Sequence, residues 1–362
     1  MKIGVLFTCY NCDSYVDESL SAWLKLKGEF DIVIAANSGM FKEYNTLGIP
    51  DRNQTTRQKL LDKKLDFLVT TTGNNLLDED YSRDVCLDYL NGGRWKRNDG
   101  CDLLFVIDGD EIYTEENIRN ILDFVMKNPD HQGYRVNYRN HTFRKGTFMY
   151  YAHDRVFWMK RHGGISRFYF DNQFEYVNHA NGTEDIRFTD SLFVPPSVAF
   201  MDHYSWLSND TRTDDKIQYQ NFRYGGINND VPQNARCSYI RTGEKLEFNP
   251  DYFSYRSLEI PILHEEIEGF PYSHNFRLDF IRSLNRIQIL DVVDEMNINV
   301  EVYNDDTDEF LYRVNLKISN GQNFWISSGV DYNSMPNFKK FRVLIFRDDQ
   351  LIHAEKIHIK QE

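Results

Sequence analysis

Three acidic residues within four positions are the strongest chemical signal in this chain. The hydrophobic run DLLFVI delivers Asp108, Gly109, Asp110 and Glu111 to its carboxyl end. Three carboxylates this close would repel one another if all were buried and unpaired, and a divalent cation removes that conflict. Oxygen ligands of this kind suit Mg²⁺ or Mn²⁺, and either ion can also bridge to a diphosphate. The alternative is a solvated acidic turn that caps the next helix.

A second pair with chemical capability is Cys9 and Cys12, in the stretch FTCYNC. Such a pair can be a redox dithiol, half of a zinc site, or two small packed residues. A structural zinc ion needs two more ligands, usually another close pair, and the other cysteines are single, at positions 86, 101 and 237. The tryptophan before a thioredoxin-type pair is missing as well. The sequence favours packing, with zinc or redox chemistry as the alternative.

Both groups lie where predicted strands end. Apolar runs at 2–8, 31–36, 65–69 and 102–107 alternate with helix-like stretches over the first 130 residues. This alternation predicts an α/β fold with a mostly parallel, doubly wound sheet and helices on both faces. Such sheets bind ligands at the carboxyl ends of their strands, where FTCYNC, ANSG and DGDE lie.

Three of the helical stretches have recognisable inner faces. Thr114 is a plausible N-cap for the third, and Asn128–Pro129 stops it. The inner-face candidates are Val16, Leu20, Trp23 and Leu24 in the first helix, Tyr81, Val85 and Leu90 in the second, and Ile118, Ile121, Leu122 and Val125 in the third.

The C-terminal part of the chain has a different sequence pattern. From about residue 290, the runs INVEVY, FLYRVNLKI, NFWISS, FRVLIF and LIHAEKIHI are separated by polar turns. We expect five strands in a small antiparallel β domain.

The bulk composition limits the classes of function. The chain has 362 residues and a formal net charge of −13, which argues against generic binding to nucleic acid or anionic membranes. No apolar run reaches the roughly 18 residues of a membrane span, and the N-terminal run is typical of a strand rather than a signal peptide. Five scattered cysteines do not form a secreted disulfide framework, so we expect a cytoplasmic protein, in the host cytoplasm if it is viral.

Taken together, the segments resemble family 2 glycosyltransferases of the GT-A fold. Those enzymes have a T/C-Y-N signature after the first strand, an R-N-x-x-L-x-x-A helix, and a hydrophobic strand that ends in D-x-D-E. The matching residues here are Thr8, Tyr10, Asn11, Arg83, Asp108, Asp110 and Glu111.

This resemblance covers about residues 1–225, and it implies a division of the chain. We expect a GT-A domain at 1–225, with a nucleotide-sugar half at 1–130 and an acceptor half at 131–225. A helical or irregular connection at 226–289 would lead to the C-terminal β domain at 290–362.

The resemblance also assigns roles around the metal. Asp108 would contact the donor's ribose or metal-bound waters, Asp110 would bind Mn²⁺ or Mg²⁺, and Glu111 would hold the loop or the sugar. The metal would neutralise the departing nucleoside diphosphate. His203 stands in VPPSVAFMDHYSW, which is followed by the lysine-containing stretch DDKIQYQNF. This matches a strand-histidine-helix block of the family, in which His203 would be a further metal or diphosphate ligand; the alternative is a structural histidine.

The remaining donor contacts come from the strand ends. After the second strand the family usually has an acidic residue that reads the nucleotide, whereas this chain has Ala36, Asn37 and Ser38. Asn37 would hydrogen-bond the base or ribose, and a UDP-sugar is the default donor. The other implied donor contacts are Thr8, Tyr10, Asn11 and Arg83.

Inverting transfer needs a base that deprotonates the acceptor hydroxyl. One branch of the family has a His-Glu pair about thirty residues before the strand-histidine block. Here Glu175 matches the acid, and Phe174 replaces the histidine. Asp171 and the pair Glu184–Asp185 are competitors, and a salt-bridged surface acid is the structural alternative for Glu175.

A basic, aromatic segment stands out in this acidic chain. Residues 131–170 contain eight cations against one acid, with eleven aromatic residues between them. Arginine and lysine can hold phosphates, and aromatic rings can stack on bases or sugars. The segment therefore suggests an anionic acceptor, with Arg155, Trp158, Lys160 and Arg161 as candidate contacts.

The sequence leads to a metal-dependent, inverting hexosyl- or pentosyltransferase as the first hypothesis. Its acceptor would be a glycan or lipid-linked sugar, or DNA with hydroxymethylated bases, as modified by enzymes of T-even-like phages. The Asn-, Asp-, Tyr- and Phe-rich composition has the character of such phages. The alternative class is a non-catalytic GT-A-like module that binds glycan. Oligomeric state is left open.

Overall fold

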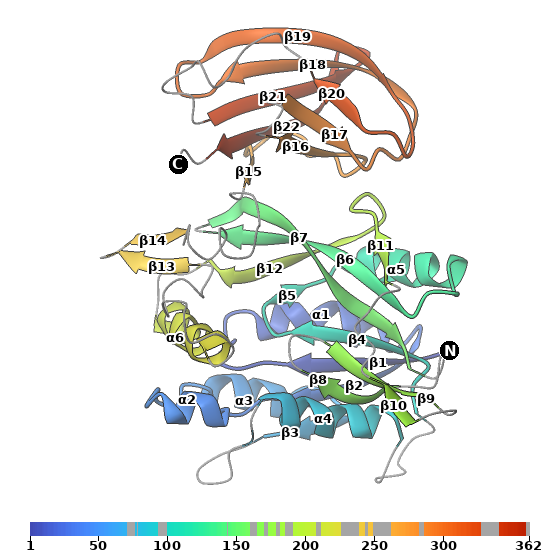
Figure 1. The fold of residues 1–362 in the computed structure, drawn as a ribbon, viewed down its shortest axis with the longest axis vertical. Helices are drawn as coiled ribbons and strands as arrows, with labels where there is room; N and C mark the ends of the chain where they lie inside the picture. Colours follow the sequence, from blue (N-terminus) through green and yellow to red (C-terminus); the bar gives the residue numbers. More distant parts are fainter. Residues whose placement is uncertain are drawn as a thin grey trace.

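The protein is a mixed α/β structure with a largely parallel central sheet and further antiparallel strands (Figure 1). The computed structural model describes residues 1–70, 77, 79–92, 100–142, 144–159, 165–169, 173–178, 182–184, 191–207, 211–225, 239–242, 245–248, 262–281, 286–326 and 340–359. Within these ranges no helix is long and apolar enough to cross a membrane.

Helices and strands alternate at the start, and strands dominate afterwards. The helices are α1 (Val16–Leu26), α2 (Lys42–Thr46), α3 (Gln54–Leu61), α4 (Glu79–Leu90), α5 (Glu115–Lys127) and α6 (Thr211–Gly225). The strands up to α6 are β1 (Lys2–Thr8), β2 (Asp31–Asn37), β3 (Phe67–Val69), β4 (Leu103–Asp108), β5 (Glu111–Ile112), β6 (Gly133–Thr142), β7 (Arg144–Trp158), β8 (Ile165–Tyr169), β9 (Gln173–Asn178), β10 (Gly182–Glu184), β11 (Ser191–Val194) and β12 (Phe200–Trp206). Those after it are β13 (Tyr239–Thr242), β14 (Lys245–Phe248), β15 (Ile262–Glu266), β16 (Arg277–Ile281), β17 (Arg286–Leu290), β18 (Met296–Asn304), β19 (Glu309–Ile318), β20 (Phe324–Ile326), β21 (Lys340–Arg347) and β22 (Gln350–Ile359).

The first four predicted strands form the parallel sheet, in the order β3-β2-β1-β4. Alternate residues of each strand face opposite sides. One side packs on α1 and α5, around Trp23 and Phe105, and the other packs on α4, around Leu90 and Val106. Both faces of the sheet are therefore covered by helices, as the sequence predicts.

The predicted inner faces of α1 and α5 are confirmed almost in full. The hydroxyl of Thr114 accepts a hydrogen bond from Asn117 N–H and caps α5. In α4 one prediction is wrong, because Tyr81 is 51% exposed while Cys86 and Leu87 face the sheet. The apolar spacing in this helix is irregular, so the periodicity selected the wrong aromatic residue.

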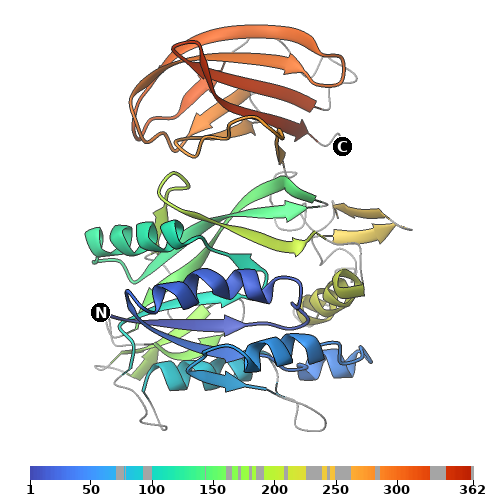
Figure 2. The same ribbon diagram turned by 180° about the vertical axis from the view of Figure 1, so that it is seen from behind.

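Antiparallel strands extend the sheet beyond β4. β7 pairs with β4 on one side and with β6 on the other, and β6 also pairs in parallel with β11 and β12. Near its start, β7 also pairs with β15, and β15 pairs with β22. One hydrogen-bonded sheet thus runs from the N-terminal strands into the C-terminal ones (Figure 2).

The five predicted C-terminal strands are confirmed as β18 to β22. Two sheets enclose their apolar core, one formed by β16, β17 and β20 and the other containing β18, β19, β21 and β22. We call β16 to β22 the C-terminal β unit. The expectation of a helical or irregular segment at 226–289 is wrong for its described residues, since these contain β13 to β17. The division of the chain at residues 225 and 290 stays a prediction.

Candidate active site

Three predicted donor contacts lie side by side at the carboxyl edge of the parallel sheet. Thr8 ends β1 and is in register with Asn37 of β2 and with Asp108 of β4. β1 lies between β2 and β4. The strand that follows β1 in the chain, β2, lies on one side of it, and β4 lies on the other side, so the strand order reverses at this edge. Doubly wound sheets bind ligands in the crevice at such a point.

The loop after β1 is held by the start of α3. Asn11 has a positive φ of 51°, and its N–H donates to Asn53 Oδ1 at 2.7 Å. The N–H of Cys12 donates to Thr56 Oγ1 at 2.9 Å. Asn and Thr side chains often satisfy loop amides in this way. The sequence analysis missed Asn53 and Thr56, because their partners are more than forty positions away.

The cysteine pair packs against the acidic turn. A Cβ placed on Gly109 would lie 2.4 Å from Cys9 Cβ and 3.1 Å from Cys12 Sγ. Burial raises the pKa of Cys9 well above its ordinary value and that of Cys12 to about 12. Both residues are therefore protonated thiols at neutral pH, and Cys12 Sγ donates to Tyr10 O at 3.2 Å. This environment supports the packing role and not a reactive thiolate.

Two arginines hold Asp108 and Glu111. Arg83 of α4 donates to Asp108 Oδ1 at 2.9 Å. Arg155 of β7 forms an ion pair with Glu111 and lies 3.4 Å from Asp108 Oδ2. The Asp108 N–H also donates to Glu111 Oε2 at 3.1 Å. Burial raises the pKa of Glu111, and the charge of Arg155 opposes this shift. The buried Glu111 side chain thus stabilises the conformation of the DGDE turn.

A β-bulge aims Arg155 at these carboxylates. Tyr134 of β6 pairs with Val156, and the next residue, Arg135, pairs with Asp154, so Arg155 is an extra residue in β7. Bulges re-aim side chains and are common beside active sites. The predicted acceptor contact Arg155 is only 4% exposed, and its partners are the acids of the DGDE turn. We therefore assign it to the support of this turn.

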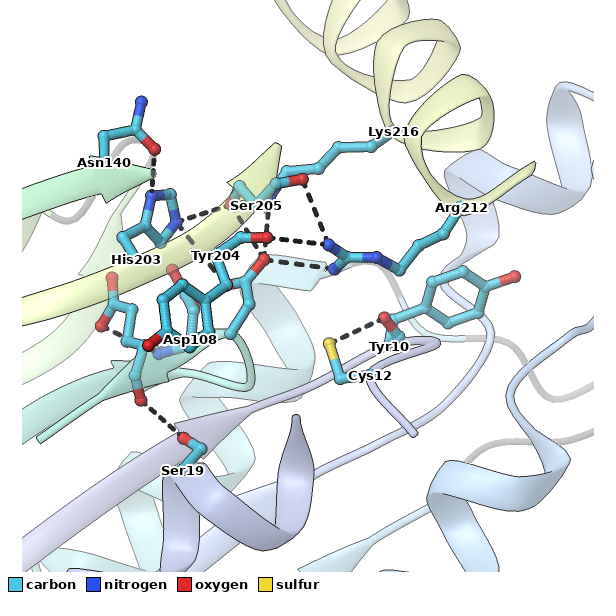
Figure 3. A network of polar contacts seen from close by, with 12 residues as sticks. Tyr10, Cys12, Ser19, Asp108, Asn140, His203, Tyr204, Ser205, Arg212 and Lys216 are labelled. Atoms are coloured by element: carbon cyan, nitrogen blue, oxygen red, sulfur yellow. Dashed lines mark hydrogen bonds and ion pairs between the residues drawn. The ribbon is translucent and has the colours of Figure 1, made fainter. Parts of the chain in front are cut away.

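Asp110 receives a different set of partners, mostly from α6. Its Oδ2 accepts from Ser205 Oγ at 2.8 Å and lies 3.2 Å from Lys216 Nζ and 3.4 Å from Arg212 Nη1. Figure 3 shows Lys216 and Arg212 reaching from α6 toward the strand that carries Ser205. Burial alone would raise the pKa of Asp110, but Lys216, His203 and Arg212 hold it far below its usual range.

His203 is oriented toward Asp110 by a hydrogen bond on its other side. Its Nδ1 lies 2.8 Å from Asn140 Oδ1, so this nitrogen carries the proton. Its Nε2 lies 2.6 Å from Ser205 Oγ and 3.6 Å from Asp110 Oδ1. Burial lowers the pKa of His203 to about 3, although the charge of Asp110 opposes this. The ring is therefore neutral, with the Nε2 lone pair facing the carboxylate.

A second bulge contributes to this arrangement. His203 pairs with Asn140 and Trp206 pairs with Thr142, so β12 has one more residue than β6 between these pairs. Ser205, His203 and Asn140 then form a hydrogen-bonded chain similar to a hydrolase triad. The side chain of Ser205 is completely buried, which leaves no surface for a substrate, so we do not assign it a nucleophilic role.

The residues present fit a metal ion only in part. Among the described residues, no three His, Cys, Asp or Glu side chains converge on a point that could hold one. Asp110 and His203 face each other, and the Asn140 contact fixes the imidazole in the manner of a metal ligand. Mg²⁺ and Mn²⁺ in nucleotide sites use one or two protein ligands together with substrate phosphates. Asp108 is instead held by Arg83 and Arg155.

The other predicted site residues are distributed unevenly. Tyr10 is half-buried and its ring stacks on Tyr44, with centroids 4.3 Å apart. Asn37 is 1% exposed and its Nδ2 donates to Thr8 Oγ1 at 2.9 Å, so in this arrangement it supports β1 and does not face a nucleotide. Trp158 is 5% exposed and lies in the core, where its Nε1 donates to Tyr134 Oη. Such a buried indole has almost no surface for an acceptor.

Three predictions cannot be placed. Lys160 and Arg161 lie outside the described residues, and for Glu175 only its position in the backbone of β9 is described. Their roles stay predictions. Two cations of this site, Lys216 and Arg212, were not predicted as site residues. Lys216 lies in the stretch DDKIQYQNF, and Arg212 precedes it by four positions, which puts both on the same face of a helix.

Comparisons with known proteins give weak likenesses. No family model and no curated protein matches the chain. Among solved structures, residues 1–349 of S. aureus TarS share 13% identity over 70% of this chain and 72% of that one, with a TM-score of 0.32. The complex of the same fragment with UDP-GlcNAc gives 14% identity over 70% and 73%, also at 0.32. A longer TarS structure gives 11% identity over 97% and 77%, at 0.30. TM-scores this low decide nothing about the chemistry of the present chain.

Proposed function

We propose that this chain is a glycosyltransferase of the GT-A type that moves a sugar from a nucleotide-sugar donor to a hydroxyl group. The observation that carries the proposal is the environment of Asp110. This buried acid lies in the turn after β4, at the point where the strand order reverses, and Lys216, Arg212 and His203 converge on it. The D-x-D-E resemblance in the sequence points to the same residues.

The charges at this edge suit a diphosphate. Two cations, Lys216 and Arg212, lie within 3.4 Å of one oxygen of Asp110. When the donor's diphosphate arrives, each can exchange part of its contact with Asp110 for a phosphate oxygen. Departure of the nucleoside diphosphate would then develop negative charge next to preorganised cations, which is the largest source of catalysis in many transfer reactions.

Asp110 and His203 would hold a Mn²⁺ or Mg²⁺ ion together with the donor phosphates. Such an ion would act as a Lewis acid on the leaving group. A donor set of one carboxylate and one imidazole favours Mn²⁺ over Mg²⁺, because imidazole is the softer ligand. The chain's own residues then have three tasks: Arg83 and Arg155 keep the turn in shape, Asn140 orients His203, and the cations of α6 receive the diphosphate.

The stereochemistry and the acceptor rest on the sequence alone. We propose an inverting reaction, on the family resemblance, with Glu175 as a candidate base. The basic, aromatic character of residues 131–170 supports an anionic acceptor. A glycan-type acceptor is the first choice and hydroxymethylated DNA is the second, because the net charge of −13 disfavours a polyanionic duplex.

The first experiment is thermal stability with UDP-, GDP-, CDP-, ADP- and dTDP-sugars, with Mn²⁺ and with EDTA. A ligand at 100 times its Kd adds about 2.7 kcal/mol to the free energy of unfolding, which is a visible shift in Tm. A shift with one nucleotide class that EDTA removes is the expected result. No shift with any nucleotide would contradict the proposal and leave the glycan-binding module.

A matched pair of variants tests the role of α6. Lys216→Gln should weaken binding of the diphosphate UDP more than that of the monophosphate UMP, because we place the lysine at the phosphate that only UDP carries. Lys127→Gln, on the exposed face of α5, removes a cation that forms a surface ion pair with Asp123 and should change neither. Equal weakening of UDP and UMP by Lys216→Gln would contradict the assignment.

A further inference from the structure

An exposed histidine stands one aromatic ring away from His203. His153 lies on β7 and is solvent-exposed. Its imidazole stacks on the ring of Tyr138, with centroids 5.2 Å apart and an interplanar angle of 14°. Tyr138 also contacts the ring of His203, in an edge-on geometry with centroids 5.2 Å apart and an interplanar angle of 77°. Tyr138 is 6% exposed, and it connects the partly buried imidazole of His203 to the exposed one of His153.

The bulge at Arg155 puts His153 on this face. In an antiparallel pair, residues directly opposite each other point to the same side of the sheet. His153 is opposite Val136, and Tyr151 is opposite Tyr138. Without the extra residue in β7, His153 and Arg155 would share one face. The bulge instead leaves Arg155 directed to Asp108 and Glu111 and gives His153 the side of β6 that carries Tyr138.

The other titratable groups at the edge are engaged, as far as the described residues show. Asp108 and Glu111 are held by arginines, and Asp110 is held by Lys216 and Arg212. Glu111 and Asp110 are also buried, so they have almost no surface for an acceptor hydroxyl. His203 is bonded to Asn140 and Ser205. His153 is therefore the described imidazole near this site that has a solvent-exposed surface for an incoming group.

We propose that His153 is the catalytic base that accepts the proton of the acceptor hydroxyl. This inference rests on the proposed glycosyl transfer. The acceptor oxygen forms a bond to the anomeric carbon, and the bond from that carbon to the diphosphate oxygen breaks with its electron pair. The hydroxyl proton passes to a neutral ring nitrogen of His153, and the imidazolium later returns it to solvent. In this scheme His203 acts at the leaving group and His153 at the nucleophile.

The test uses the full chain and the nucleotide sugar that gives the largest thermal shift, with water as the acceptor. His153→Ala and His153→Gln should lower kcat for release of nucleoside diphosphate by about a hundredfold or more, the range for loss of a general base. The KM for the donor and the donor-induced shift in Tm should stay within twofold, because the donor contacts are intact. Added imidazole should restore part of the activity of His153→Ala and none of the activity of Asp110→Asn.

A control variant and the turnover of the parent distinguish a failure of this inference from a failure of the proposed function. His131→Gln, two positions before the start of β6, should behave like the parent. If the His153 variants retain kcat within twofold while the parent turns over, the inference is wrong and the base lies elsewhere, with Glu175 next. If the parent releases no diphosphate from any nucleotide sugar, the proposed function fails first and the inference fails with it. Loss of activity without rescue by imidazole, together with a changed Tm, would assign His153 a structural role and overturn the proposal.

Discussion

Two regions of this molecule bury carboxylates, and they compensate the charge in different ways. At the carboxyl edge of the parallel sheet, Asp108, Asp110 and Glu111 face arginine and lysine side chains. Where β15 joins the C-terminal β unit, the completely buried Glu355 lies 3.2 Å from His264 Nδ1 and 3.2 Å from His353 Nε2.

The two regions differ in the side chains that pair with the carboxylates: arginine and lysine at the sheet edge, and histidine at the junction. Arginine and lysine keep their charge throughout the physiological range, whereas histidine gains or loses a proton close to neutrality. The sheet edge can therefore keep a constant electrostatic field for a ligand. The junction depresses the pKa of Glu355, so its contribution to stability is lost in acid. Four predictions follow from this contrast, in order of decreasing effect.

Asp110→Asn should have the largest effect. The amide keeps the size of the side chain and can still contact Ser205, but it leaves Lys216 and Arg212 without their carboxylate. Loss of several kcal/mol of charge stabilisation lowers kcat by roughly a thousandfold. Steady-state release of nucleoside diphosphate measures this, and unchanged turnover in a folded variant would remove Asp110 from the mechanism.

Glu355→Gln should cost about 3 kcal/mol of stability at pH 7. Burial would raise the pKa of Glu355, but His264 and His353 outweigh it and lower the pKa from 4.5 to about 2. A depressed acid stabilises the fold above its unfolded pKa, and this contribution disappears as the pH falls from about 4.5 toward 2. Urea unfolding should show the parent and variant converging in that acid range. A constant difference between them, or none at pH 7, would contradict the linkage; Glu309→Gln, at an exposed position, is the control.

Gly109→Ala should destabilise the protein by about 2 kcal/mol, the usual cost of overpacking. The new Cβ would lie 2.4 Å from Cys9 Cβ, so either the turn or the loop after β1 must move. Adding Cys9→Gly, which removes that carbon, should recover part of the loss. Gly28→Ala meets only ordinary contact at 3.9 Å and serves as the control. No recovery in the double variant would mean that the contact is not the cause.

Donor affinity should change least, by less than about twofold between pH 8 and pH 5. Burial lowers the pKa of His203 to about 3, so this ring stays neutral over the whole interval. A histidine with the ordinary pKa of 6.5 would lose roughly thirtyfold in metal affinity by pH 5. Titration with a nucleotide sugar and Mn²⁺ at several pH values measures this, and a midpoint near 6.5 would show that His203 is not shielded.

Much of the fold of the first 130 residues could be predicted from the sequence, because its signals are local. The four parallel strands, the Thr114 cap and the inner face of α5 follow from apolar periodicity and capping chemistry. The same holds for β18 to β22, where polar turns separate short apolar runs. Asp108 and Asp110 could be located for the same reason, since a strand that ends in acids puts them at one edge.

The partners of those acids could not be predicted, because no local rule encodes them. Arg155 and Ser205 reach their positions through β-bulges, which change the direction of every later side chain in a strand without leaving a mark in the sequence. Asn37 matched a donor contact in position, yet the close packing of β1 and β2 buries it.

The sequence by itself determined the order of the elements and the edge at which the acids lie, because periodicity and chain direction are local properties. Only the tertiary structure decided which cations face those acids. Lys216 lies 106 positions from Asp110 and Arg155 lies 44 positions from Glu111. Contacts over such separations depend on strand register, bulges and helix docking, which the chain fixes only when the whole sheet forms.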